Sequence, residues 1–261
     1  MTLQNRTNHL AGIFLVLVFL ISPPAAVSAE DVVLMLSNNN WPPFFFGRES
    51  DTEKGIAREI LEHCLTKMGY AFEFKFYTLR RMHHYMEQGK LDIAIYSYKK
   101  SREAYLIYGQ EPLFSAVYRP IVRADSDIKI SSISDFDNYK LGHLAGLQYS
   151  DEFFEYTMKR AKEGTLVIMP SEEVVLDLLL KQHIDVFVST DTSILYRAKQ
   201  RGILDKIKIL DFEIRTSIYR VTFSKKSKSI KNKKDFLKQL DQCIRTLKAE
   251  GHYKKILDKY R

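Results

Sequence analysis

The chain has 261 residues, of which 45% are hydrophobic and 28% are charged. This length and hydrophobic content exclude a mini-protein and a globally disordered chain, because a substantial core can form. Lysine and arginine exceed aspartate and glutamate by 40 to 32, which gives a formal net charge of +8. Acidic residues accompany the basic ones along most of the chain, so we do not expect a nucleic-acid-binding protein. We interpret the lysine-rich run at 225–234 as a solvated loop that leads into a helix.

The first 29 residues have the pattern of a cleavable signal peptide. A positive charge at Arg6 precedes a continuous apolar stretch of twelve residues at 10–21, and small residues up to Ala29 offer a cleavage site. This stretch is shorter than the about 20 residues that a membrane-spanning helix needs. We therefore expect residues 1–29 to be removed on export, which would leave a soluble protein in the periplasm.

The two cysteines, Cys64 and Cys243, each fall on the apolar face of an expected helix. Export would permit a disulfide bond between them, but two cysteines are too few for a disulfide scaffold. Cysteine is among the most buried side chains even when it is unpaired. We therefore favour buried free thiols and leave the pairing open.

From residue 32 onward, the spacing of apolar residues alternates between the period of a strand and the period of a helix. Strands are expected at 32–37, 71–77 and 91–96, and helices at 56–68 and 79–88. This β-α-β-α-β order predicts a mainly parallel sheet that is covered by helices.

A second α/β series lies between two long extended segments, at 113–123 and 212–223. Its expected elements are strands at 140–143, 166–169 and 184–188 and helices at 150–162, 172–181 and 191–200. Helices at 234–248 and 252–260 close the chain. We therefore expect an α/β protein with two lobes joined by two hinge strands. Residues 30–117 and 213–261 would form lobe 1, and residues 118–212 would form lobe 2. A cleft between such lobes would open and close by a hinge motion.

Motifs of known enzyme classes are scarce. The sequence has no glycine-rich phosphate loop, no serine between glycines at a nucleophile elbow, and no pair of histidines at metal spacing around a glutamate. His83 and His84 are adjacent, so on a helix they point about 100° apart and do not suit a shared metal ion. We expect no catalytic residues, no metal site and no cofactor.

The loop after the first expected strand concentrates aromatic residues. Trp41, the only tryptophan, precedes two prolines and three phenylalanines at 42–46. Large aromatic side chains dominate both pockets and cores. The loop could therefore form an aromatic wall beside a ligand or plug the end of the sheet, and its composition favours neither role.

A series of short motifs runs from this loop to the last helices. They are Trp41-Pro42-Pro43-Phe44, the segments 55–60 and 89–92, Ser101-Arg102, Leu141-Gly142 with Gly146, and the segments 184–186 and 221–225. In this order and spacing, the motifs resemble those of the family 3 periplasmic solute-binding proteins, which include substrate-binding proteins of polar amino-acid ABC transporters. The resemblance implies the two-lobed type II periplasmic-binding-protein fold, with one amino acid bound between the lobes.

The resemblance also implies roles for particular residues. The first-loop aromatic that stacks on the ligand falls on Trp41. The hydroxyl that stands five residues before a carboxylate-binding arginine falls on Ser97, with the arginine at Arg102. A planar guanidinium matches a carboxylate with two hydrogen bonds. From composition alone, a surface position on a short helix is the more ordinary interpretation of Arg102.

Further parts of the implied site lie in the second lobe. The resemblance places Gly146 beside the ligand, and backbone NH groups near Gln148, at the start of the following helix, would bind the ligand carboxylate. The acid that receives the ligand ammonium falls on Thr190 or Asp191, of which only Asp191 supplies charge. Asp191 also suits the ordinary role of a helix N-cap.

The function implied by the resemblance is the capture of a small polar solute, such as an amino acid, by a monomeric protein that delivers it to an inner-membrane ABC permease. Two alternatives stay open from the sequence. One is an enzyme of the same fold, similar to the dehydratases that act on cyclic carboxylic acids. The other is a ligand-sensing module for a membrane signalling partner.

Overall fold

The computed structural model describes residue 1 and residues 32–38, 40–47, 53–145, 147 and 149–260. Apart from residue 1, the expected signal peptide with its cleavage site at Ala29 lies outside these residues. All the helices and strands given below belong to residues 31–261, which form one compact unit. Among the described residues, no helix combines the length and the apolar character needed to cross a membrane.

The first half of the chain folds as its apolar spacing predicts. Strand β1 (Val33–Asn38) pairs in parallel with both β2 (Ala71–Phe76) and β3 (Ile93–Ser97). Helices α1 (Ile56–Lys67) and α2 (Leu79–Gln88) form the crossovers between these strands. The predicted β-α-β-α-β unit is therefore confirmed.

The second α/β series forms the other end of the sheet. Strand β5 (Leu141–Leu144) pairs in parallel with β6 (Leu166–Met169) and with β7 (Val186–Thr190). The helices between and after these strands are α3 (Asp151–Lys162), α4 (Glu172–Leu180) and α5 (Asp191–Gln200). Each helix begins after a hydroxyl side chain that accepts a hydrogen bond from a backbone NH of the first turn, which stabilises the helix start. These N-caps are Ser150, Ser171 and Thr190.

Two long antiparallel strands, β4 (Leu106–Arg123) and β9 (Arg215–Ser224), join the two ends. The sheet order β2-β1-β3-β9-β4-β7-β5-β6 places them in the middle, and the short strand β8 (Ile207–Ile209) also pairs with β4. Strand β4 begins ahead of the expected residue 113 because its first residues pair with the end of β9 before a register shift. The sequence pattern does not predict β8, since three residues are too few to show a strand period.

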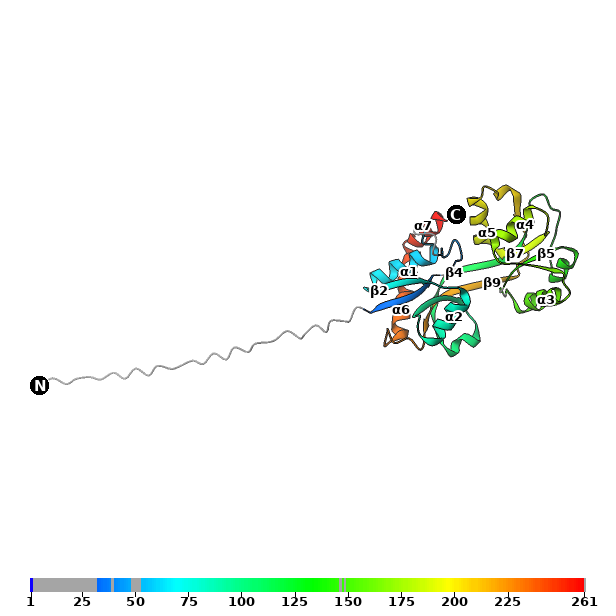
Figure 1. The fold of residues 1–261 in the computed structure, drawn as a ribbon. Helices are drawn as coiled ribbons and strands as arrows, with labels where there is room; N and C mark the ends of the chain where they lie inside the picture. Colours follow the sequence, from blue (N-terminus) through cyan, green and yellow to red (C-terminus); the bar gives the residue numbers. More distant parts are fainter. Residues whose placement is uncertain (2–31, 39, 48–52, 146, 148, 261) are drawn as a thin grey trace. The chain divides into compact units, whose positions relative to one another are not determined.

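Short 3-10 helices and two C-terminal helices complete the fold. They are η1 (Lys100–Ala104), η2 (Ile133–Asn138), η3 (Leu204–Lys206), α6 (Lys233–Ala249) and α7 (His252–Lys259). In Figure 1, helices α1, α2, α6 and α7 lie around the β2 end of the sheet, and α3, α4 and α5 lie around the β6 end. The lysine-rich run leads into α6, as predicted.

Buried apolar side chains form separate clusters at the two ends of the sheet. Clusters at the β2 end include Leu36, Ile60 and Phe223, and clusters at the β6 end include Leu179 and Phe187. Separate cores joined by β4 and β9 suit a two-lobed protein. The residue boundaries expected for lobes 1 and 2 stay a prediction.

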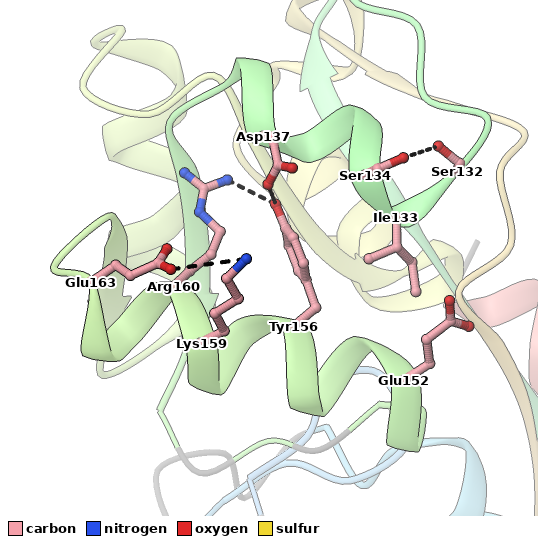
Figure 2. Close-up of a pocket in the computed structure, with 9 residues that line it drawn as sticks. All are labelled: Ser132, Ile133, Ser134, Asp137, Glu152, Tyr156, Lys159, Arg160 and Glu163. Atoms are coloured by element: carbon pink, nitrogen blue, oxygen red, sulfur yellow. Dashed lines mark hydrogen bonds and ion pairs between the residues drawn. The ribbon is translucent and has the colours of Figure 1, made fainter.

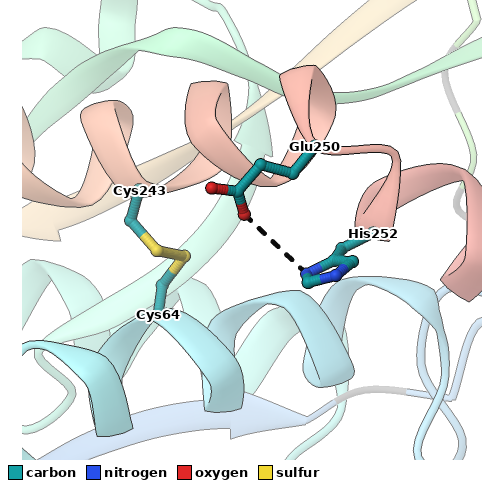
Figure 3. The surroundings of a disulfide bond; sticks show 4 residues. All are labelled: Cys64, Cys243, Glu250 and His252. Atoms are coloured by element: carbon teal, nitrogen blue, oxygen red, sulfur yellow. Dashed lines mark ion pairs between the residues drawn. A yellow bond between two sulfur atoms is a disulfide. The ribbon is translucent and has the colours of Figure 1, made fainter.

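Cys64 of α1 and Cys243 of α6 form a disulfide bond, with their Cα atoms 5.8 Å apart (Figure 3). The interpretation as free thiols is therefore wrong. Apolar spacing shows that each cysteine faces the core, but it does not show that α1 packs against α6. The two cysteines are 179 residues apart in the sequence.

Candidate functional site

The middle of the sheet, where β4 and β9 run side by side, carries a cluster of aromatic side chains. Phe114 of β4 stacks on Tyr219 of β9, with ring centroids 4.9 Å apart, and their backbones are paired in the sheet. Trp41 contacts both rings, with its centroid 5.5 Å from that of Phe114 and 4.9 Å from that of Tyr219. Trp41 therefore lies where the first loop meets the two long strands.

A tight turn holds Trp41 in this position. Its backbone NH donates to the Phe45 carbonyl at 2.9 Å, and the Phe45 NH donates back at 3.0 Å. Phe44 and Phe45 are each 2% exposed and belong to the core, whereas Trp41 is only half-buried. The phenylalanines therefore fill the core. Trp41 packs against this core and keeps part of its surface exposed, so its role as an aromatic wall beside a ligand stays a prediction.

Ser97 and Arg102 lie next to the same aromatic cluster. Ser97 ends β3 and pairs with Tyr219 in the sheet. Arg102, in η1, donates from Nη1 to the Ser97 carbonyl at 3.0 Å. Its guanidinium also lies over the Tyr96 ring, 4.7 Å from the centroid. Trp41 therefore contacts the Tyr219 ring, Ser97 pairs with Tyr219 in the sheet, and Arg102 is linked to them through the Ser97 carbonyl.

Two further tyrosines extend the site toward the β6 end of the sheet. The hydroxyls of Tyr118 and Tyr219 are 3.0 Å apart. The Tyr149 ring lies 5.0 Å from the Tyr118 ring, and its hydroxyl donates to the Val188 carbonyl at 2.9 Å. Burial raises the pKa of all three phenols above the usual range. They are therefore neutral near pH 7 and can both donate and accept hydrogen bonds.

Three basic side chains lie around the tyrosines. Arg215 of β9 donates from Nη1 to the Tyr149 carbonyl at 2.6 Å. Lys99 precedes η1, and its carbonyl accepts the backbone NH of Arg102 at 3.0 Å. Burial, followed by the charges of Arg102 and Arg215, lowers the pKa of Lys99, and Asp151 opposes this effect. Among the described carboxylates, none lies within 4.0 Å of a charged nitrogen of these three residues. This part of the site therefore carries an excess of positive charge.

Asp191 is the first residue of α5 but not its N-cap. Thr190 takes that role, since its hydroxyl accepts the Ser193 NH at 3.3 Å, so the N-cap interpretation of Asp191 is wrong. The Asp191 Oδ2 atom lies 3.6 Å from Arg119 Nη1. Burial raises the pKa of Asp191, and the Arg119 charge opposes this effect. Within the part of the chain that the structure describes, Asp191 Oδ1 and Arg119 Nε are buried without a hydrogen-bond partner. The carboxylate thus has a cationic neighbour inside the protein.

Glu172, the first residue of α4, is the acid whose charge acts on Tyr118 and Tyr149. It accepts hydrogen bonds from the Ser189 hydroxyl and from Arg197 Nε, the latter at 2.7 Å. Its charge contributes to the raised pKa of Tyr118, after burial, Tyr219 and Tyr149. Like Asp191, Glu172 has its own arginine partner.

The other residues discussed from the sequence, Gly146, Gln148 and His83, contribute no side chain to the site described above. Gly146 and Gln148 lie outside the residues that the structure describes, so their roles stay predictions. His83 stacks on Tyr96 at 5.0 Å, and burial followed by the neighbouring cations lowers its pKa to about 4. Across the described parts of the chain, no group of three or more histidine, cysteine or acidic side chains could hold a metal ion.

A cavity of about 340 Å³ between η2 and α3 includes none of these residues (Figure 2). Arg160, which lines it, is 7% exposed. It donates to the backbone carbonyls of Phe136, Tyr139 and Thr165 at 2.6, 3.1 and 3.0 Å. Figure 2 also shows its bond to the Tyr156 hydroxyl. These bonds connect three backbone segments, so Arg160 stabilises the fold there.

No sequence motif identifies four residues of the central site. They are Lys99, Tyr118, Arg215 and Tyr219. The last three lie in the long extended segments, and Tyr118 is 101 residues from Tyr219 in the sequence. Their polar side chains within those segments are the only signal that could have drawn attention to them.

The order of the strands and the two long central strands define the mixed α/β, type II periplasmic-binding-protein fold. Residues 33–261 match the sequence profile of the bacterial extracellular solute-binding proteins, family 3. The chain therefore belongs to this family, as its motifs predict. No curated protein matches the sequence of the chain.

Solved structures with this fold include proteins of several kinds. The ligand-binding core of GluR0 from Nostoc punctiforme, in complex with L-glutamate, is 20% identical with a TM-score of 0.67, over 87% of this chain and 98% of that chain. A histidine kinase sensor domain with similarity to periplasmic binding proteins is 18% identical with a TM-score of 0.66, over 88% of this chain and 95% of that chain. A second substrate-binding domain, assigned to an amino acid ABC transporter of Streptococcus pneumoniae, is 20% identical with a TM-score of 0.64, over 87% of this chain and 99% of that chain. At these identities the likeness establishes the fold alone.

Proposed function

We propose that this protein binds a small polar solute, such as an amino acid, and delivers it to an inner-membrane ABC permease. The observation that carries the proposal is the position of Arg102, which bonds to the carbonyl of Ser97, the sheet partner of Tyr219. Trp41 packs on the same Tyr219, at the strands that join the two ends of the sheet. A guanidinium next to an aromatic surface can bind a carboxylate and cover the apolar part of the same molecule. Membership of the solute-binding family supports this role.

In this proposal, the ligand lies between lobe 1 (residues 30–117 and 213–261) and lobe 2 (residues 118–212). The ligand-binding residues are Trp41, Ser97, Arg102, Gly146, Gln148 and Asp191. Arg102 receives the carboxylate, and Trp41 stacks on the ligand. Asp191 can receive an ammonium group only if its carboxylate turns from Arg119, which lies 3.6 Å away.

We further propose that residues 1–29 direct export and are removed, and that the mature protein acts as a monomer in the periplasm. The family's extracellular character supports export. The Cys64–Cys243 disulfide supports it too, because disulfides form and persist in oxidising compartments. Mass spectrometry of the periplasmic protein should show the chain beginning at Glu30, and size-exclusion chromatography with light scattering should give the mass of a monomer.

A thermal-shift screen tests the central proposal. Amino acids, polyamines, organic acids and sugars would each be added to the purified mature protein. A ligand present at about 100 times its Kd adds about 2.7 kcal/mol to the free energy of unfolding, which raises Tm. We expect stabilisation by at least one polar small molecule, with a 1:1 stoichiometry by calorimetry. No stabilisation by any of the four classes would contradict the proposal.

A ligand sensor is the second candidate, because a histidine kinase sensor domain shares this fold. Deletion of the gene would separate the two functions. Loss of solute uptake supports transport, whereas intact uptake with a lost transcriptional response supports sensing.

An enzyme of the same fold is the remaining alternative. Glu172, the acid near the tyrosines, and Asp191 already have arginine neighbours, which does not favour a free acid for catalysis. We expect no turnover when cyclic carboxylic acids such as prephenate are incubated with the protein.

A further inference from the structure

Around the candidate site, the acidic side chains have basic partners, but three basic side chains have no acidic partner within the described part of the chain. The acids Asp191 and Glu172 lie 3.6 Å and 2.7 Å from Arg119 and Arg197 respectively. The three basic residues Lys99, Arg102 and Arg215 have no such partner among the described carboxylates. Positive charge that the protein leaves uncompensated beside a site attracts a ligand of the opposite sign.

Arg215 and Arg102 are joined by a continuous set of contacts. Arg102 bonds to the carbonyl of Ser97, and Ser97 is paired with Tyr219. Tyr219 contacts the hydroxyl of Tyr118, which is paired with Arg215 across β4 and β9. Arg215 and Tyr219 are four residues apart on β9, so their side chains share one face of the strand at a Cα separation of about 13 Å.

Both arginines have donors left for a ligand. A guanidinium carries five N–H donors in a planar fork. Arg215 uses one of them for the Tyr149 carbonyl, and no other protein bond from it occurs among the described residues. Arg102 uses one for the Ser97 carbonyl and interacts with the Tyr105 hydroxyl. Burial and, after it, the charges of Arg102 and Arg215 lower the pKa of Lys99, so a second negative group beside these three cations would reduce their mutual repulsion.

We propose that the ligand is an anion with two acidic groups, such as an acidic amino acid or a dicarboxylate, and that Arg215 and Lys99 bind the second group while Arg102 binds the first. This inference rests on the proposed function, because it specifies the ligand of the same site. The neutral hydroxyls of Tyr118 and Tyr219, between the two arginines, can donate hydrogen bonds to either group.

Calorimetry with a defined set of probes tests the inference. The set comprises L-glutamate, L-aspartate and succinate, the neutral L-glutamine, the cationic L-arginine and L-lysine, and inorganic phosphate. We expect an acidic probe to bind at least tenfold more tightly than L-glutamine and the cationic probes to bind most weakly. The affinity of the acidic probe should fall as the salt concentration rises.

Variants that remove a positive charge then test where the second acidic group of the ligand binds. Arg215→Gln and Lys99→Gln should each weaken the best acidic probe at least tenfold and change L-glutamine binding less than threefold. Lys100→Gln is the matched control, because Lys100 is adjacent in sequence but 84% exposed and paired with Glu103. It should leave all affinities unchanged. Thermal melts of each variant without ligand confirm that the fold is retained.

The outcomes separate the inference from the proposed function. Tighter binding of L-arginine, L-lysine or L-glutamine than of every acidic probe would overturn the inference and leave the solute-binding function intact. Equal losses for L-glutamate and L-glutamine in Arg215→Gln would also overturn it. Phosphate binding as tight as that of the acidic probes would show an unspecific anion site. The absence of binding by any probe here and by any class in the wider screen would overturn both.

Discussion

Tyr219 connects most of the candidate site, because its ring and its hydroxyl have different partners. The ring contacts Trp41 and Phe114, with centroids 4.9 Å away in each case. The hydroxyl lies 3.0 Å from that of Tyr118. A neutral tyrosine suits this position, since it combines apolar contact area with a hydrogen-bonding end.

Replacing Arg102 by lysine tests the carboxylate role. Arg102→Lys keeps the positive charge but loses the planar pair of donors, so we expect ligand affinity to fall at least tenfold, about 1.4 kcal/mol. Calorimetry with the ligand found by the screen measures this loss. Arg245→Lys is the control, because Arg245 lies on exposed α6 surface and bonds to Gln242. Unchanged affinity in a folded Arg102→Lys variant would remove Arg102 from the site.

Part of this site could be predicted from sequence. The family resemblance predicts Trp41, Ser97 and Arg102 because each belongs to a short local motif. In the structure Trp41 and Ser97 both adjoin Tyr219 and Arg102 bonds to Ser97, whereas their roles toward a ligand stay predictions. Tyr118 and Arg215 belong to extended segments that have no motif. Their proximity comes from the register of β4 against β9, which local apolar spacing does not specify.

Helices α1 and α6 are joined covalently as well as by packing. Removing the disulfide with Cys64→Ala and Cys243→Ala should lower the free energy of unfolding by about 2–4 kcal/mol, mainly because the unfolded chain gains freedom. Ligand affinity should stay within about twofold, since no residue of either helix belongs to the candidate site.

Urea denaturation with and without a reducing agent measures this contribution. Reduction should destabilise the unaltered protein and leave the double alanine variant unchanged. Equal stability of the reduced and oxidised unaltered protein would contradict the prediction.

The 3-10 helix η2 begins with a capping box that is sensitive to pH. Asp135 accepts hydrogen bonds from the Ser131 NH at 2.7 Å and the Ser132 NH at 2.9 Å, and these bonds lower its pKa to about 2. Because the folded-state pKa lies below the usual value of about 4, the ionised carboxylate favours the folded state above pH 4. This contribution is lost as the pH falls toward 2.

We therefore expect Asp135→Ala to lower Tm at pH 7 and to lower it less at pH 3. Melting curves by circular dichroism at the two pH values test this expectation. Asp205→Ala is the control, because Asp205 is an exposed acid in the first turn of η3. A Tm difference for Asp135→Ala that is independent of pH would contradict the proposed role of the charge.

The sequence predicts the positions of the helices and strands more completely than it predicts how they pair and pack. Apolar periodicity locates the helices and parallel strands because each buries one face or one run of residues. It fails for β8, which has three residues, and for the start of β4, where pairing with β9 extends the strand. It fails for the disulfide because helix packing is a property of the whole fold.

The first loop contacts α5 as well as the central strands. The Ser193 hydroxyl donates to the Pro42 carbonyl at 2.8 Å, and the Tyr196 hydroxyl donates to Glu53 at 2.9 Å. The Phe46 and Tyr196 rings are 5.6 Å apart. The loop that carries Trp41 therefore has contacts with elements from both ends of the sheet, and a hinge motion between the lobes would change its surroundings.

The fluorescence of Trp41 should report this motion. Trp41 is the only tryptophan and is half-buried beside Tyr219, so its emission comes from one place in the molecule. Closure of the lobes around a ligand would exclude water from the indole. We expect a saturable change in emission on titration with the ligand, with a Kd equal to the calorimetric value.

Two substitutions of Trp41 distinguish its fluorescence signal from its contribution to ligand affinity. Trp41→Phe should abolish the fluorescence change but keep part of the affinity, because a phenyl ring retains stacking area against the ligand. Trp41→Ala should weaken binding further, because it removes the aromatic surface and leaves Phe114 and Tyr219 without their neighbour. Normal binding by Trp41→Ala, together with unchanged emission of the unaltered protein under a saturating ligand, would show that Trp41 only packs against the central strands.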